Sequence, residues 1–192
     1  MNEPHRHFTY VESERRQRQN PEAILAMIGL KAGMCFVDLG CNDGFFSVPA
    51  AKMVGPEASV YAIDIDESAL DRLKTKLQKQ GIGNTTVLQG PAEEVVACQG
   101  CADIIFLGTV LHDFRDPLKA LSNCRQMLSA DGYIFDYDWK KQDSFHGPPY
   151  NIRFSPEQVN KLAGQAGLEV VATKDVDENF YLIQLKKSDS AK

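Results

Sequence analysis

The stretch "FVDLGCNDGFF", residues 36 to 46, decides how this chain folds. An apolar run ends at Asp38, and Gly40 and Gly44 then bracket a short polar turn before a second apolar segment. This order is typical of a β-strand, a tight loop and an α-helix in which the loop backbone approaches a ligand closely. A plain strand-to-helix turn has the same pattern, so the loop alone leaves both interpretations open.

The pattern continues along the chain. Apolar runs at 59–66, 85–90, 101–109 and 133–139 alternate with amphipathic segments, of which 67–81 has Asp66 as its expected cap and Gly81 as its expected end. The segment 116–132 is expected to be a helix that ends at a turn. Apolar runs that alternate with helices indicate a mostly parallel sheet covered on both faces.

The last two expected strands, 168–176 and 179–187, are nearly contiguous. A parallel crossover needs about a dozen residues or more, so the last strand should be antiparallel. The predicted fold is therefore α/β, a doubly wound, mostly parallel seven-stranded sheet with an antiparallel last strand. We expect one domain at 20–187, a polar N-terminal segment at 1–19 and a polar tail at 188–192.

Composition and charge exclude several classes of function. The net charge of −5 argues against recognition of nucleic acid by a basic surface. No run reaches the ~18 apolar residues of a membrane span, and the N-terminus has no apolar core typical of a secretory signal. The five scattered cysteines are therefore expected to be reduced thiols in the cytoplasm. No set of metal ligands is expected, and the oligomeric state is left open.

A second acid favours a nucleoside as the ligand. Asp64 ends the run "VYAID", 20 residues after Gly44, where a carboxylate can accept both hydroxyls of a ribose. The dinucleotide fingerprint would place glycines at 40, 42 and 45, but this chain has Asn42 and Phe45. The expected ligand is a nucleoside without phosphates.

Five motifs in order then carry a resemblance: "VDLGCNDG", "VYAIDID", "LQGPAEEV", "ADIIFLGTVLHDFRDP" and "CRQMLSADGYI". Over residues 20–140 the chain resembles class I S-adenosylmethionine-dependent methyltransferases, and its ending resembles a prokaryotic subgroup that acts on small molecules. The resemblance implies S-adenosylmethionine as cofactor and a small-molecule methyl acceptor. It also implies contacts with the cofactor from Asp38, Gly40, Asn42, Gly44, Asp64, Ile65, Ala92, Glu93, Thr109 and Leu111.

The resemblance assigns each of these residues to one part of the cofactor. Asp38 and the loop to Gly44 would hold the methionine end, and Asp64 the ribose. Ile65, Ala92 and Glu93 would surround the adenine, while Thr109 and Leu111 would border the sulfonium.

Two positions depart from the family pattern. Asn42 stands where relatives usually carry glycine, and asparagine tolerates a left-handed backbone better than other residues. Pro91 stands where many relatives have an aspartate for the adenine amino group, so Glu93 or a backbone carbonyl must substitute.

The candidate catalytic residues are His112 and Asp138. His112 lies at the mouth of the fourth strand and could act as a general base; the alternative is a helix-start or packing residue that bonds the backbone. Asp136 and Asp138 share one face of the fifth strand, and Asp138 lies nearer its end; the alternative for Asp138 is an ion pair with a nearby lysine. Tyr10, Arg15, Arg16 and His146 are candidates to cover the site, with Trp139 in a lip over the acceptor.

Cys98 and Cys101 form a C-x-x-C without the partners of a zinc site. A redox dithiol and a thiol site that captures substrate are two other interpretations, but surface-loop or packing cysteines are expected. Two other functions remain open: a cofactor-binding module without turnover, and a dinucleotide-dependent oxidoreductase.

Overall fold

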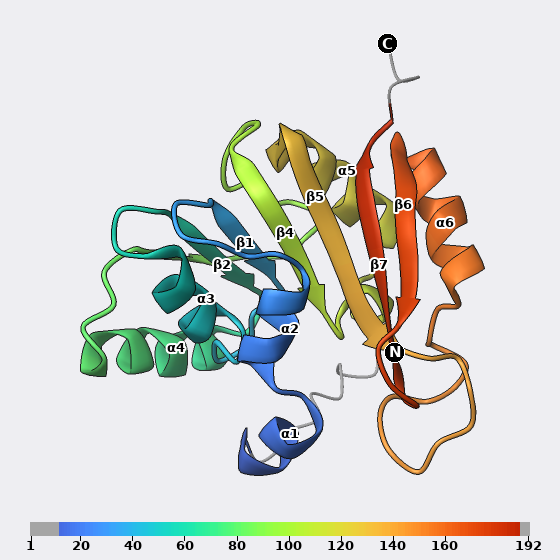
Figure 1. The fold of residues 1–192 in the computed structure, drawn as a ribbon, viewed down its shortest axis with the longest axis horizontal. Helices are drawn as coiled ribbons and strands as arrows, with labels where there is room; N and C mark the ends of the chain where they lie inside the picture. Colours follow the sequence, from blue (N-terminus) through green and yellow to red (C-terminus); the bar gives the residue numbers. More distant parts are fainter. Residues whose placement is uncertain (1–11, 189–192) are drawn as a thin grey trace.

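The structure, a computed structural model, describes residues 12–188 and contains one seven-stranded sheet (Figure 1). The strands lie in the order β3-β2-β1-β4-β5-β7-β6. The order reverses between β1 and β4, and ligands of such sheets bind beyond the strand ends at this point. The strands are β1 (Phe36–Leu39), β2 (Val60–Asp64), β3 (Thr85–Gln89), β4 (Ala102–Gly108), β5 (Leu128–Trp139), β6 (Leu168–Asp175) and β7 (Phe180–Lys187).

The strand directions confirm the predicted fold. Strands β1 to β5 pair in parallel, whereas β7 is antiparallel to both β5 and β6. The short connection between β6 and β7 forces this reversal, because it has no room for a crossover helix.

Helices cover both faces of the sheet, as Figure 1 shows. Phe36 and Phe106 pack with α2 and α3 on one face, while Val37 and Ile105 pack with α5 and α6 on the other. Consecutive strand residues point to opposite faces, so both sides of the central strands are apolar. The helices are α1 (Glu12–Arg18), α2 (Pro21–Met27), α3 (Ser47–Val54), α4 (Glu67–Lys79), α5 (Pro117–Met127) and α6 (Pro156–Gln165), with a 3-10 turn η1 (Leu111–Asp113). In the described chain, no helix is long and apolar enough to cross a bilayer.

Local signals in the sequence place several helix starts. Asn20 caps α2, Asp66 caps α4, and Ser155 forms a capping box with Gln158 at the start of α6. The predicted end of the helix at 116–132 is wrong, because α5 stops at Met127 and Leu128 already pairs with Ala102 of β4. The pairing register then shifts between Ala102 and Ile104, so residues 129–132 of β5 have no paired residue in β4.

Candidate functional site

The loop between β1 and α3 has an unusual backbone. Gly40, Asn42 and Gly44 have φ angles of 79°, 48° and 87°, so the predicted left-handed conformation of Asn42 is confirmed. The Asn42 side-chain oxygen accepts a hydrogen bond from the Asp43 N–H at 2.7 Å, which stabilises this turn locally. A Cβ atom at Gly40 would collide with the Val110 side chain, so glycine is required there.

Asp64 ties this loop to the second strand. One carboxylate oxygen accepts the Asn42 N–H at 2.7 Å and the other accepts the Asp66 N–H at 2.9 Å. A carboxylate oxygen can accept more than one hydrogen bond, so both remain able to bind ribose hydroxyls. Ile65 follows directly and is 50% exposed, which offers an apolar surface beside that carboxylate. These two residues therefore suit a sugar and a base.

Asp38 lies buried beneath the loop. Its carboxylate accepts a hydrogen bond from the Ser47 hydroxyl at 2.5 Å. Burial raises the pKa of Asp38 to about 7, although Ser47 and the Arg15 guanidinium act in the opposite direction. A cation brought to this carboxylate would favour its ionised form, which is the chemistry expected for a methionine ammonium group.

Thr109 follows β4 with a φ angle of 60°. This conformation is strained for a β-branched residue, and such strain tends to occur at functional sites. Hydrogen bonds hold it in place, because its N–H donates to the Tyr137 carbonyl at 2.7 Å and its hydroxyl donates to the Gly108 carbonyl at 2.6 Å. Thr109 is therefore fixed at the ligand edge of the sheet.

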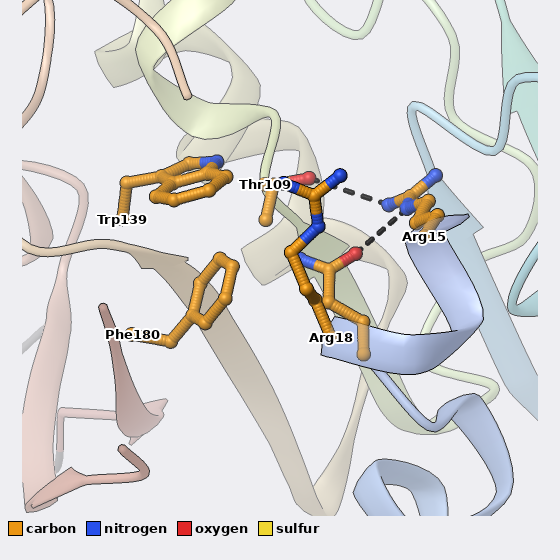
Figure 2. A pocket seen from close by; sticks show the side chains of 6 residues that line it. Arg15, Arg18, Thr109, Trp139 and Phe180 are labelled. Carbon is orange, nitrogen blue, oxygen red and sulfur yellow. Dashed lines mark hydrogen bonds between the residues drawn. The ribbon is translucent and has the colours of Figure 1, made fainter. Parts of the chain in front are cut away.

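Helix α1 lies at the edge toward which the arrowheads of β4 and β5 point (Figure 1). Arg15 stacks over the Phe45 ring at 4.1 Å and donates to the Thr109 hydroxyl oxygen at 3.4 Å. Figure 2 shows the guanidinium groups of Arg15 and Arg18 near Thr109, with Trp139 and Phe180 on the other side. The cavity among these residues is only about 20 Å³, room for a water molecule. The described part of the N-terminal segment thus occupies space beside Thr109.

The other candidate covering residues differ in placement. Arg16 forms an ion pair with Glu22 at 3.2 Å, and His146 is exposed in the loop after β5. Tyr10 lies outside the described residues. Trp139 is buried and its ring packs closely on Gly147.

Arg153 holds the loop after β5 together and was missed at the sequence level. It is 3% exposed and donates to the carbonyl oxygens of Lys140, Gln142, His146 and Pro148 at 2.8–3.0 Å. Its guanidinium also lies 5.4 Å from the centre of the Trp139 ring. No local sequence signal distinguishes this arginine from a surface one.

Three further residues predicted to contact the cofactor make contacts within the protein. Leu111 has no exposed surface and packs in the core, so the structure gives no support to its predicted contact with a sulfonium. The Ala92 carbonyl accepts the Asn123 side-chain amide at 3.0 Å, and Glu93 accepts the Asp116 N–H at 3.1 Å. Glu93 therefore links the loop after β3 to the start of α5.

The two candidate catalytic residues meet. The His112 Nδ1 atom lies 2.8 Å from an Asp138 carboxylate oxygen, and both side chains are nearly fully buried. Burial lowers the pKa of His112, but the carboxylates of Asp138, Asp113 and Asp136 outweigh it and raise the pKa to about 9. The alternative ion pair between Asp138 and a lysine is not formed, since Lys140 pairs with Asp175 and Lys141 donates to the Arg153 carbonyl.

Asp136 and Tyr181 extend this polar group into the core. The Tyr181 hydroxyl donates to one Asp136 oxygen at 3.4 Å, and the other Asp136 oxygen has no hydrogen-bond partner in the described chain. Burial and the Asp138 charge raise the pKa of Asp136 well above its ordinary value. Tyr181 was missed, although an antiparallel β7 beside β5 brings it opposite Asp138.

The expectation of reduced cysteines is wrong at one place. Cys98 and Cys101 form a disulfide, while Cys35, Cys41 and Cys124 are free. Three residues of separation in the turn before β4 bring the two sulfur atoms together, which the spacing alone did not establish.

A family model described as "Methyltransferase domain" matches residues 30–173. The chain belongs to this methyltransferase domain family. A solved structure, a SAM-dependent methyltransferase from Aquifex aeolicus, matches with a TM-score of 0.83 and 28% identity, covering 92% of this chain and 98% of that one. The resemblance and fold seen in the sequence are thus confirmed, and S-adenosylmethionine is the cofactor that the family implies.

The curated relatives match this chain over only part of their own length. The ubiquinone/menaquinone biosynthesis C-methyltransferase UbiE of Marinomonas sp. (strain MWYL1) is 30% identical over 62% of this chain and 48% of its own length. The demethylmenaquinone methyltransferase of Geobacillus kaustophilus (strain HTA426) is 25% identical over 64% of this chain and 52% of its own. The chain therefore spans about half the length of the curated relatives it matches.

Proposed function

We propose that this chain transfers a methyl group from S-adenosylmethionine to a small-molecule acceptor, mainly by holding the reactants in line. The observation that carries the proposal is the double role of Asp64. This one carboxylate fixes the loop after β1 and the start of α4, and it keeps acceptor positions for a ribose.

Each part of the site has an assigned task. The cofactor, when bound, supplies a methyl group activated by a sulfonium. Asp64 orients the ribose, and Ile65 lies against the adenine with Ala92 and Glu93 nearby. Asp38, with the backbone of Gly40, Asn42 and Gly44, receives the ammonium end. Positioning of this kind can supply roughly 7–11 kcal/mol of a reaction barrier.

The His112–Asp138 pair holds a proton beside the acceptor side of the site. With a pKa of about 9, His112 is protonated at neutral pH and cannot accept another proton. We therefore assign the pair a positioning role at neutral pH and a base role only in alkaline solution. A rate that rises with pH up to about 9, and loses this rise in His112→Asn, would identify the base role.

The N-terminal segment, residues 1–19, is proposed to cover the bound reactants. The contacts of Arg15 with Phe45 and Thr109 support this role, as does the very small cavity beside them. We propose that α1 moves aside to admit the reactants and that its return excludes water.

A small-molecule acceptor and a cytoplasmic location are also proposals. The net charge of −5 and the similarity to methyltransferases of ubiquinone and menaquinone biosynthesis support the first. The Cys98–Cys101 disulfide removes the cysteine argument for the second, which stays a proposal.

Calorimetry with S-adenosylhomocysteine and, separately, NAD tests the cofactor. We expect binding of the first and none of the second. Asp64→Ala should weaken binding by about tenfold or more, because hydrogen bonds to a charged group are worth roughly 1.5–3 kcal/mol. Asp71→Ala, on the exposed side of α4 and paired with Lys74, is the matched control.

Turnover separates an enzyme from a binding module. The full chain is incubated with S-adenosylmethionine labelled in its methyl group and a metabolite fraction free of protein and nucleic acid. A labelled small product supports transfer. Binding without any labelled product would favour the module, and unchanged affinity in Asp64→Ala would remove the ribose assignment.

A further inference from the structure

A third sulfur atom lies against the Cys98–Cys101 disulfide. The Cys35 Sγ atom is 3.6 Å from the Cys101 Sγ atom, although the residues are 66 positions apart in the sequence. A disulfide bond is about 2.05 Å long, so a movement of about 1.5 Å would join them. All three cysteines are half-buried rather than sealed in the core.

The backbone fixes this approach. Cys35 directly precedes β1, and Cys101 directly precedes β4, its neighbour in the sheet. The Asp103 carboxylate accepts the Cys35 N–H at 2.8 Å, and the Cys35 carbonyl accepts the N–H groups of Asp103 and Ile104 at 3.0 and 3.2 Å. The two sulfur atoms are therefore held together by strand pairing, at the edge of the sheet opposite the cofactor site.

We propose that Cys35, Cys98 and Cys101 form a thiol–disulfide exchange site in which the disulfide moves between Cys98–Cys101 and Cys35–Cys101. The Cys35 thiolate attacks the Cys101 sulfur, the bond between Cys98 and Cys101 breaks, and Cys98 leaves as a thiolate. Cys98 takes up the proton that Cys35 gave up, so atoms, charge and electrons balance without an external oxidant.

The exchange changes which parts of the chain are linked. In the first form the bond closes the four-residue segment 98–101, and in the second it joins the residues that precede two adjacent strands. Cys98 then becomes a free thiol beside the exposed residues Gln99 and Gly100, where it can react with small disulfides or alkylating agents. Burial and the Asp103 charge raise the pKa of Cys35 to about 11, so the exchange is slow at neutral pH.

Native alkylation of the full chain tests the proposal. The chain is oxidised to one disulfide, freed of oxidant, exposed to iodoacetamide at pH 8.5 and quenched in acid before peptide mapping by mass spectrometry. With a static disulfide, Cys35 is the only thiol of the three that can be labelled. With exchange, we expect label on Cys98 as well as Cys35, and a Cys35–Cys101 linked peptide in the molecules labelled at Cys98.

Three variants make the result specific. Cys35→Ser should abolish the label on Cys98, and Cys98→Ser should form the Cys35–Cys101 disulfide on oxidation. Cys124→Ala removes a buried cysteine elsewhere and should leave labelling of Cys35 and Cys98 unchanged. The proposal is overturned if Cys98 stays unlabelled in the full chain, if no single-disulfide form can be prepared, or if folded Cys98→Ser leaves Cys35 and Cys101 reduced.

Discussion

Asn42 supplies a left-handed backbone position that most side chains disfavour. We expect Asn42→Ala to lower the free energy of unfolding by about 1–2 kcal/mol, because alanine meets the full steric cost and loses the bond to the Asp43 N–H. Asn42→Gly should cost much less, since glycine adopts this conformation freely. Urea denaturation of both variants measures the difference, and equal losses would contradict this account of the turn.

The His112–Asp138 pair should make stability depend on pH. The pKa of His112 rises from its ordinary value of 6.5 to about 9 in the folded state, so its stabilising effect is complete below about pH 6.5 and is lost as pH rises through about 9. The stability difference between the original chain and His112→Asn should therefore be larger at pH 6 than at pH 10. Urea titrations at both values measure it.

His146→Asn provides the matched control, because it removes a histidine from the exposed loop after β5. A difference for His112→Asn that grows toward alkaline pH would show that the pair does not hold a proton in the folded chain.

The positions of single residues were predictable where a polar side chain follows the carboxyl end of a strand. Asn42, Asp64 and His112 were placed correctly because a parallel sheet brings its carboxyl ends to one edge. The pairing of His112 with Asp138 and the role of Arg153 were not, since both depend on contacts between loops that no local pattern specifies.

The first part of β5, where its register against β4 shifts, depends on Gly132. A Cβ atom there would lie 2.5 Å from the Ala102 carbonyl oxygen and 2.8 Å from the Ser129 hydroxyl. Gly132→Ala should therefore lower the free energy of unfolding by about 1–3 kcal/mol, the usual cost of forced packing. Gly83→Ala, where a Cβ meets open space, is the control and should be neutral or stabilising by up to about 1 kcal/mol.

Urea denaturation of these two glycine variants measures both effects. Equal stability of Gly132→Ala and Gly83→Ala would mean that the chain around Gly132 shifts without cost. That result would contradict the close contacts of Gly132.

Elements were predicted well where their caps are local. Asp66 and Ser155 mark helix starts by short-range hydrogen bonds, and the expected cap at Asp66 is confirmed. The end of α5 was misplaced because pairing of Leu128 with Ala102 outweighs the turn signal in "SADG". Long-range pairing of this kind overrides local propensity.

The whole molecule is proposed to consist of one domain at 20–187 and a covering segment at 1–19. A chain that begins at residue 20 should unfold in a single thermal transition and bind S-adenosylhomocysteine about fivefold more weakly, because contacts such as those of Arg15 are worth roughly 1 kcal/mol. Circular dichroism and calorimetry measure the two effects.

Arg15→Ala in the full chain should reproduce part of this loss. Arg72→Ala is the control, since Arg72 is an exposed arginine of α4 whose guanidinium donates to the Ser68 hydroxyl. Aggregation of the shortened chain, or undiminished affinity in it, would contradict the proposed division.

Arg153 allows the sequence of the loop after β5 to vary without a change in its backbone. Most of its hydrogen bonds go to main-chain oxygen atoms, which every amino acid possesses, and one goes to the Ser144 hydroxyl. Substitutions at exposed loop positions could therefore accumulate without altering the path of the chain. The outer surface of this loop could then diverge among descendants while one internal arginine preserves its form.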